Sequence, residues 1–140
     1  GAWYAEDRLL PFARRADLTS ATLDRVIERL AAGTFDDEAA AARLHGDLWS
    51  GNVLCSQNGV VLIDPAAHGG HRLTDLAMLE LFGTPQLGRV YAAYEEASEW
   101  LPNEWRTLIG LHQLHPLLVH AELFGGDYAR RAIESAGYYT

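Results

Sequence analysis

The 140-residue sequence contains no lysine, so all 11 of its Lys or Arg positions are arginines. With 19 acidic residues, the net charge is -8. An acidic chain without a basic stripe argues against nucleic acid as a partner. No hydrophobic run approaches the length of a membrane span, and no signal peptide opens the chain. These absences argue against a nucleic-acid-binding protein and against a membrane protein.

Cysteine is almost as scarce. The one cysteine, Cys55, cannot form an internal disulfide, which favours a reducing, cytoplasmic location. It lies in an apolar stretch, so we expect a buried, unreactive thiol. Glycine-rich phosphate loops of both common types are also missing. The length is sufficient for one domain with a hydrophobic core, and the sequence shows no internal repeat.

The most informative stretch spans residues 45–65 and reads HGDLWSGNVLCSQNGVVLIDP. It contains three side chains with oxygen atoms, Asp47, Asn52 and Asp64. Two apolar runs lie between the last two of these and flank an Asn-Gly pair at 58–59. Because Asn-Gly is the preferred pair for a type I′ turn, the pattern predicts a β-hairpin.

The hairpin predicts where the oxygen donors meet. With residues 58–59 as the loop, Cys55 would lie opposite Leu62, and Val53 opposite Asp64. The hairpin would then return Asp64 to within one residue of Asn52. Strand alternation would point their side chains to opposite faces, so the backbone must leave the ladder there.

An amide oxygen and a carboxylate held together suit magnesium, which binds one or two protein oxygens besides phosphate and water. Asp47 lies in the loop just before, free to face the same spot. One metal-binding pair and one separate carboxylate is the arrangement used for phosphoryl transfer. We therefore predict Asn52 and Asp64 as magnesium ligands and Asp47 as the catalytic residue that orients the attacking hydroxyl.

The order His-x-Asp-x-x-x-x-Asn, then a short hairpin and an Asp, resembles the catalytic loop and metal-binding Asp of the protein-kinase-like superfamily. The segments HGDLWSGN, DPA, DLAMLELFG and HQLHPLLVHAELFGGDY are similar to the fructosamine kinase (ketosamine kinase) family. The resemblance covers about residues 1–135. It implies a mainly α fold with a small β-hairpin (α+β), the C-terminal lobe of a protein-kinase-like fold.

A kinase of this type also needs a cation on the ATP phosphates, usually a lysine in the N-terminal lobe. Since the chain has neither a lysine nor a phosphate loop, we interpret residues 1–140 as the catalytic-loop and substrate-binding lobe, without the ATP-binding N-terminal lobe. That lobe would be its partner, and we expect the isolated segment to be inactive. We also expect the face toward the missing lobe to be apolar.

The resemblance implies ATP- and Mg²⁺-dependent phosphorylation of a sugar hydroxyl on a ketosamine, a step that reverses glycation. Two alternatives stay open: an aminoglycoside- or choline-kinase-like phosphotransferase, and a catalytically silent module that binds nucleotide or a partner. Only ten residues lie between Asp64 and Asp75. This is too short for the long segment on which a protein kinase binds a peptide, and it favours a small-molecule or glycated side-chain acceptor.

Three further residues are expected to support the catalytic loop. His45 would do so by hydrogen bonding and packing, and Gly46 by a backbone angle that strains larger residues. Asp75 falls where the superfamily often ties a helix-start Asp to the loop backbone.

Trp49, His68 and Arg72 are candidates for substrate binding. Trp49 would form an aromatic wall near the acceptor sugar, with core packing as the alternative. His68 and Arg72 lie just after the metal-binding Asp, where a solvated loop is the alternative. Leu73 departs from the family pattern, which has an acidic residue there, and this leaves substrate preference open.

Hydrophobic periodicity predicts helices around the hairpin. One is capped by Asp17, Thr19 or Ser20 and ends at Gly33. Alanine content makes residues 36–43 a further helical candidate, and residues 42–45 a short strand. A second helix is expected to be capped by Thr74, and a third to start at residues 84–85. The longest helix is expected to follow residues 102–103, to be kinked or divided at Pro116 and to end at residues 125–126. Asp127 is the expected cap of the last helix.

Overall fold

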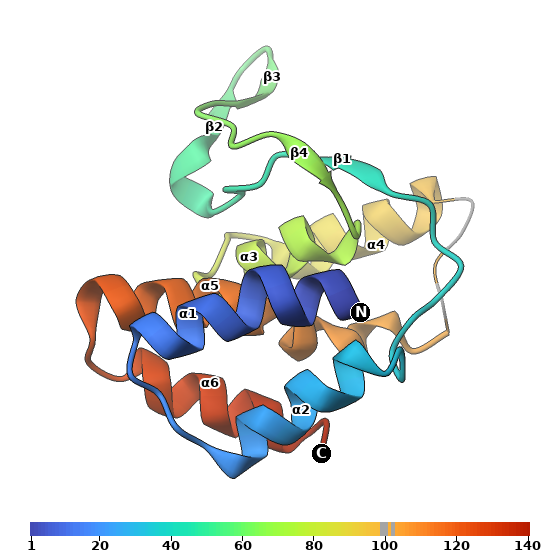
Figure 1. The fold of residues 1–140 in the computed structure, drawn as a ribbon. Helices are drawn as coiled ribbons and strands as arrows, with labels where there is room; N and C mark the ends of the chain where they lie inside the picture. The colour runs from blue at the N-terminus through green and yellow to red at the C-terminus, as the bar shows by residue number, and fades with distance from the viewer. Residues whose placement is uncertain (99–100, 102) are drawn as a thin grey trace. The chain divides into compact units, whose positions relative to one another are not determined.

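The computed structural model describes residues 1–98, 101 and 103–140 (Figure 1). They form two compact units, one from residues 1–38 and 110–140 and the other from residues 39–109. Each unit is described by itself. Together they are mostly helical with two small antiparallel sheets, which confirms the predicted fold class. Among the described residues, no helix combines the length and apolar character needed to cross a membrane.

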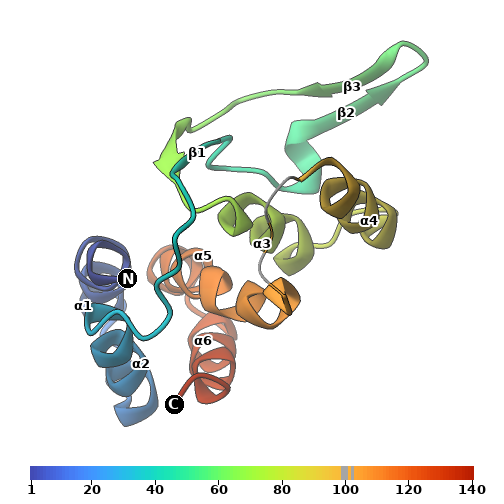
Figure 2. The same ribbon diagram turned by 90° about the vertical axis from the view of Figure 1, so that its right-hand side faces the viewer.

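The first unit is helical throughout its regular structure. It contains a π-helical turn η1 (Tyr4–Leu9), α1 (Leu10–Arg15), α2 (Ala21–Ala31), most of α5 (Ile109–Phe124) and α6 (Tyr128–Gly137). Helix α2 packs beside α6 and against η1 (Figure 2). Its core contains the fully buried side chains of Leu9, Leu23, Val26, Leu114 and Leu118.

Helix α2 forms as its sequence predicts. The Ser20 hydroxyl caps it by accepting a hydrogen bond from the N–H of Leu23 at 3.4 Å. Its apolar residues are buried, and Gly33 follows the helix with φ 76°. These buried residues are Leu23, Val26, Ile27 and Leu30. Because a β-carbon is unfavourable at this angle, glycine ends the helix at low cost.

Pro116 lies inside α5, which continues through it and is not divided. Proline has no N–H, so the carbonyl of His112 lacks its helical donor. The hydroxyl of Tyr4 lies 3.3 Å from this carbonyl and 3.2 Å from that of Leu111, and it accepts a hydrogen bond from the N–H of His115 at 3.2 Å. Burial raises the pKa of Tyr4, which keeps the hydroxyl protonated and able to donate. One side chain therefore replaces the missing helical hydrogen bonds.

Tyr4→Phe is expected to lower the free energy of unfolding by about 1–3 kcal/mol, since it leaves buried backbone groups of α5 without a partner. Urea denaturation of the purified protein measures this change. The control is Tyr138→Phe at an exposed tyrosine of the same unit, expected to stay within about 0.5 kcal/mol of wild type. Equal stability of Tyr4→Phe and wild type would show that the hydroxyl does not support α5.

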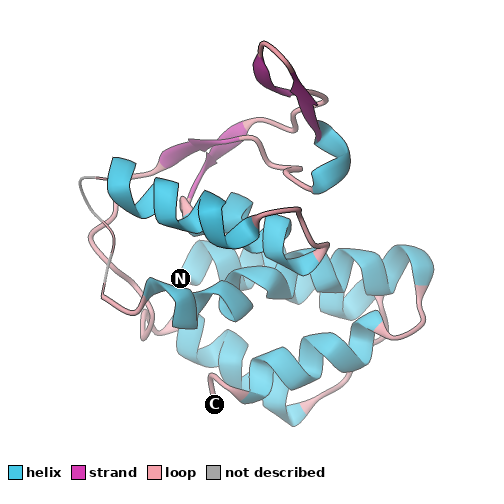
Figure 3. Cartoon of the chain, turned by 180° about the vertical axis from the view of Figure 1, so that it is seen from behind, coloured by secondary structure: helices cyan, strands magenta, loops and turns pink. Residues whose placement is uncertain are grey.

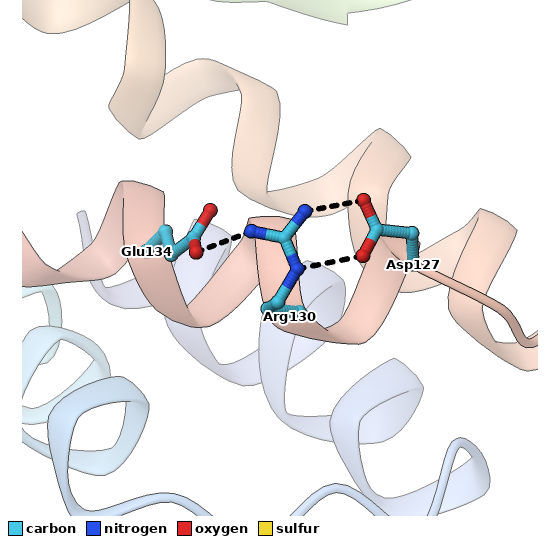
Figure 4. A network of polar contacts seen from close by, with 3 residues as sticks. All are labelled: Asp127, Arg130 and Glu134. Carbon is cyan, nitrogen blue, oxygen red and sulfur yellow. Dashed lines mark hydrogen bonds and ion pairs between the residues drawn. The ribbon is translucent and has the colours of Figure 1, made fainter.

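Contrary to the prediction from the sequence, Asp127 does not cap its helix by a side-chain hydrogen bond. Asp127 precedes α6 but makes no capping hydrogen bond. Its two carboxylate oxygens accept hydrogen bonds from Arg130, which also contacts Glu134 one turn later (Figure 4). These hydrogen bonds lower the pKa of Asp127. Because all three side chains are exposed, the network contributes little to stability.

The second unit contains all the strands of the described chain (Figure 3). They are β1 (Ala42–Leu44), β2 (Val53–Ser56), β3 (Gly59–Leu62) and β4 (His68–Gly70), with a short 3₁₀ turn η2 (Ser50–Asn52) before β2. Helices α3 (Leu73–Leu81) and α4 (Leu87–Ala97) and the turn η3 (Trp105–Leu108) complete it. Their shared core comprises Leu73, Leu76, Ala77, Tyr91, Trp105 and Ile109.

Several predicted boundaries in this unit are corrected. The helical candidate at 36–43 is wrong, because residues 36–41 are irregular and β1 follows. Thr74 does not open α3, which starts at Leu73, whose N–H donates to Nδ1 of His71 at 3.3 Å. Leu73, the departure from the family pattern, is fully buried in the core. The predicted boundary at Pro102 lies outside the described residues.

Candidate active site

The hairpin forms, but its predicted register is wrong. Val53 pairs with Leu62 and Ser56 with Gly59, so the two loop residues are at 57–58 instead of 58–59. The hydroxyl of Ser56 accepts a hydrogen bond from the N–H of Asn58 at 3.2 Å and donates one to the Gly59 carbonyl at 3.1 Å. This side-chain turn closes the loop one residue early and leaves Gly59 in the strand.

The corrected register still brings Asp64 to Asn52. The N–H of Ile63 donates to the Asn52 carbonyl at 3.1 Å, so Asp64 is the next residue beyond this pair. Asp64 has φ 52°, a left-handed conformation in which the backbone leaves the ladder. No hydrogen bond or ion pair with described residues engages its carboxylate. Aspartate is among the non-glycine residues that adopt this conformation most readily.

Asn52 is joined directly to Asp47. It is only 6% exposed, and its Nδ2 donates to the Asp47 carbonyl at 2.8 Å and to Oδ2 of the Asp47 carboxylate at 3.1 Å. Two acceptors on one side fix the orientation of the amide. Its other atom, Oδ1, is therefore the oxygen left to bind a cation.

His45 links this loop to the end of β3. Its Nδ1 accepts a hydrogen bond from the Asp47 N–H at 3.3 Å, so the proton lies on Nε2, which donates to the Ile63 carbonyl at 2.9 Å. The ring thus connects the residue before Asp64 to the backbone of Asp47.

Asp75 fixes the loop from the other side. From the first turn of α3, its two carboxylate oxygens accept hydrogen bonds from the N–H of His45 at 2.7 Å and of Gly46 at 3.0 Å. These contacts are those expected of a helix-start Asp bound to the loop.

Gly46 lies where two segments of the site cross. It has φ 84°, and a β-carbon there would lie 2.2 Å from the Ala66 carbonyl oxygen and 2.9 Å from Nδ1 of His68. Strand β4, which was not predicted, pairs with β1 and places Leu44 opposite His68. The loop that carries Asp47 and the segment after Asp64 are therefore in direct contact at a position that only glycine fits.

Gly46→Ala is expected to destabilise the protein by about 2–5 kcal/mol, because it adds left-handed strain to a clash with backbone. Thermal or urea denaturation of the purified protein measures the effect. Gly69→Ala is the matched control, since nothing lies within 4 Å of its added β-carbon and its φ is not left-handed. Unchanged stability of Gly46→Ala would contradict the close crossing.

The three candidate substrate-binding residues lie in the same unit. Trp49 is 43% exposed, so its indole is not part of the core. His68 is half-buried in β4, and its Nδ1 donates to the Ala66 carbonyl at 2.9 Å. Arg72 is half-buried directly before α3. Neither of the last two lies in a fully solvated loop.

The expected burial of Cys55 is wrong, because the thiol is exposed on β2. Its neighbours on the hairpin are exposed as well: Leu54, Val60, Val61 and Leu62. The hairpin extends away from α3 (Figures 1 and 2), and apolar residues on both of its strands are exposed.

The donor set fits magnesium better than a transition metal. In the described part of the chain, no three His, Cys, Asp or Glu side chains gather in a way that could hold a metal ion. Asn52 Oδ1 and the Asp64 carboxylate offer two hard oxygens, which suits an ion that keeps water and phosphate as its other ligands.

The family model described as fructosamine kinase matches residues 1–136. The chain belongs to the fructosamine kinase family. Among curated proteins it is 34% identical over 129 residues to the "Probable ketoamine kinase YniA" of Escherichia coli (strain K12), covering 90% of this chain and 44% of that protein. It is 37% identical over 114 residues to a "Probable ketoamine kinase" of Klebsiella pneumoniae, covering 81% of this chain and 88% of that protein.

Solved structures of the family have the same fold. A crystal structure named as a fructosamine-3-kinase from Thermobifida fusca superposes with a TM-score of 0.87 at 50% identity, covering 98% of this chain and 49% of that chain. One from Haemophilus somnus superposes with a TM-score of 0.78 at 20% identity. The chain spans about half the length of most of these fructosamine kinase relatives.

Proposed function

We propose that this chain is the catalytic lobe of an ATP- and Mg²⁺-dependent kinase that phosphorylates a sugar hydroxyl of a ketosamine. The observation that carries the proposal is the hydrogen bonding of Asn52 to Asp47, with Asp64 turned out of the hairpin directly beside Asn52. Membership of the fructosamine kinase family supports the substrate class.

In this proposal, Asp47 accepts a hydrogen bond from the acceptor hydroxyl, orients its oxygen toward the γ-phosphorus and takes up its proton during transfer. Asn52 holds Asp47 in place through Nδ2, and Asn52 Oδ1 and the Asp64 carboxylate would hold magnesium. When bound, the ion neutralises charge on the phosphates. His45 and Asp75 fix the backbone of the loop that carries Asp47, which limits the rearrangement needed there before reaction.

The ATP-phosphate cation and the nucleotide roof would come from an N-terminal lobe outside this chain. Two features support this division. The chain has no lysine, and its hairpin exposes an apolar surface that is unusual unless something covers it. A cytoplasmic location fits the lone, exposed Cys55, which needs a reducing environment to stay free.

The isolated chain of 140 residues is accordingly expected to show no measurable phosphoryl transfer, while the full-length protein is active. A coupled assay for ADP release on both proteins measures the difference. Turnover by the isolated chain at a rate near that of the full-length protein would contradict the division into lobes.

Trp49, His68 and Arg72 are proposed to contact the acceptor. All three lie in the unit that holds Asp47, and the segment between Asp64 and Asp75 is too short to hold an extended peptide. An exposed indole suits the apolar face of a sugar ring.

The acceptor class is tested by incubating the full-length protein with ATP and magnesium and a panel of ketosamines, aminoglycosides and choline, with mass spectrometry of the products. Phosphorylation of ketosamines is the expected result. Phosphorylation of only aminoglycosides or choline would overturn the substrate class, and nucleotide binding without any transfer would overturn the proposal of an enzyme.

A further inference from the structure

The indole of Trp49 lies against the backbone of Gly51. A β-carbon built on Gly51 would lie 2.3 Å from Cη2, 2.4 Å from Cζ2 and 2.7 Å from Cζ3 of the Trp49 ring. Real β-carbons do not approach other atoms so closely, so the ring occupies the volume of a side chain at residue 51. With any residue other than glycine there, the indole must move.

Backbone conformation does not explain the glycine. Gly51 lies in the 3₁₀ turn η2, and its φ is outside the left-handed region, so an alanine would fit the backbone without strain. The contrast with Gly46 is direct, since a β-carbon at Gly46 meets a backbone carbonyl in a left-handed conformation. At Gly51, the Trp49 ring alone leaves no room for a side chain.

The contact with Gly51 places the Trp49 ring close to Asp47 and Asn52 in the chain. The N–H of Trp49 donates to the Asp47 carbonyl at 3.1 Å, and the Trp49 carbonyl accepts from the N–H of Asn52 at 2.9 Å. The backbone of Trp49 is thus bonded to both residues of the proposed centre, while its indole is 43% exposed.

We infer that Gly51 is a positioning residue, which seats the Trp49 indole as a fixed surface on which the acceptor's sugar ring stacks. The inference rests on the proposed function and adds to it the residue that sets the ring's place. Because the displaced atoms belong to an exposed side chain, Gly51→Ala moves the indole and leaves the loop folded. Its effect therefore appears in acceptor binding and not in phosphoryl transfer itself.

The test uses full-length protein labelled with 5-fluorotryptophan, with the Trp49 resonance identified by its loss in Trp49→Phe. In Gly51→Ala, the Trp49 ¹⁹F resonance is expected to shift before any ligand is added. The KM for the ketosamine is expected to rise by about two- to tenfold, the range of one aromatic contact. The kcat and the KM for ATP stay within about twofold of wild type. Gly88→Ala, an exposed helical glycine with nothing within 4 Å, is the matched control and changes none of these values.

The outcomes separate the inference from the proposed function. A wild-type protein that phosphorylates no ketosamine ends the proposed function and the stacking role with it. A wild-type protein that is active, with an unshifted resonance or an unchanged ketosamine KM in Gly51→Ala, overturns the inference alone. A loss of kcat in Gly51→Ala at unchanged KM also overturns it, because the glycine would then support the catalytic loop and not the acceptor surface.

Discussion

Asp47→Asn is expected to lower the kcat of the full-length enzyme by about 10²–10⁴-fold, the range for removal of a general base. The substitution keeps the size and planarity of the side chain, and an amide oxygen can still accept the hydrogen bond that Asn52 Nδ2 now donates to Oδ2 at 3.1 Å. What it removes is the negative charge that orients the acceptor hydroxyl and takes its proton. The KM for ATP is therefore expected to change little.

Initial-rate kinetics on the purified variant, with circular dichroism to establish that it is folded, measure this effect. Asp24→Asn, at an exposed Asp of helix α2, makes the same chemical change in the other unit and is expected to keep wild-type activity. A folded Asp47→Asn enzyme within tenfold of the wild-type kcat would remove Asp47 from the catalytic role.

The second large effect is expected at Asp64. Asp64→Asn should lower kcat by about 10²–10³-fold at ordinary magnesium concentrations, because it replaces a charged ligand of the cation by a neutral one. Asparagine adopts the left-handed conformation about as readily as aspartate, so the φ of 52° is retained and the fold is not strained. Raising the magnesium concentration should restore part of the activity, which a purely structural defect would not show.

The control for this variant matches it in both residue type and backbone conformation. Asp17 is also an exposed aspartate with left-handed backbone, at φ 50°, so Asp17→Asn makes the same change in the same conformation away from the site. Its activity and magnesium dependence should match wild type. An Asp64→Asn enzyme with unaltered magnesium dependence would show that Asp64 is not a ligand.

The order of residues along the chain was enough to predict that the hairpin returns Asp64 to Asn52. Asn52 and Asp64 flank two apolar runs with a turn between them, and any short hairpin brings such flanking residues together. The prediction therefore survives an error of one residue in the loop. The contact of Asp75 with the loop backbone was likewise expected from the resemblance, and the structure contains it.

Other features depend on contacts that the hydrophobic and turn patterns of the sequence do not predict. The hairpin register is set by two hydrogen bonds of the Ser56 hydroxyl, which compete with the preference of Asn-Gly for the turn. Strand β4 contains two glycines, which have low strand propensity, and it exists because β1 pairs with it. Cys55 is exposed because no other described element of its unit packs over its side chain, which its apolar neighbours in the sequence do not reveal. The contact of the Trp49 indole with Gly51 depends on the side-chain rotamer of Trp49.

In the proposed mechanism, Asn52 and Asp64 share one cation while Asp47 faces the acceptor hydroxyl. A crystal structure of the full-length enzyme with magnesium, a non-hydrolysable ATP analogue and a ketosamine would reveal this arrangement. We expect magnesium bound by Asn52 Oδ1 and the Asp64 carboxylate, with the acceptor hydroxyl within hydrogen-bonding distance of Asp47. Magnesium bound without these two residues, or an acceptor hydroxyl out of reach of Asp47, would contradict it.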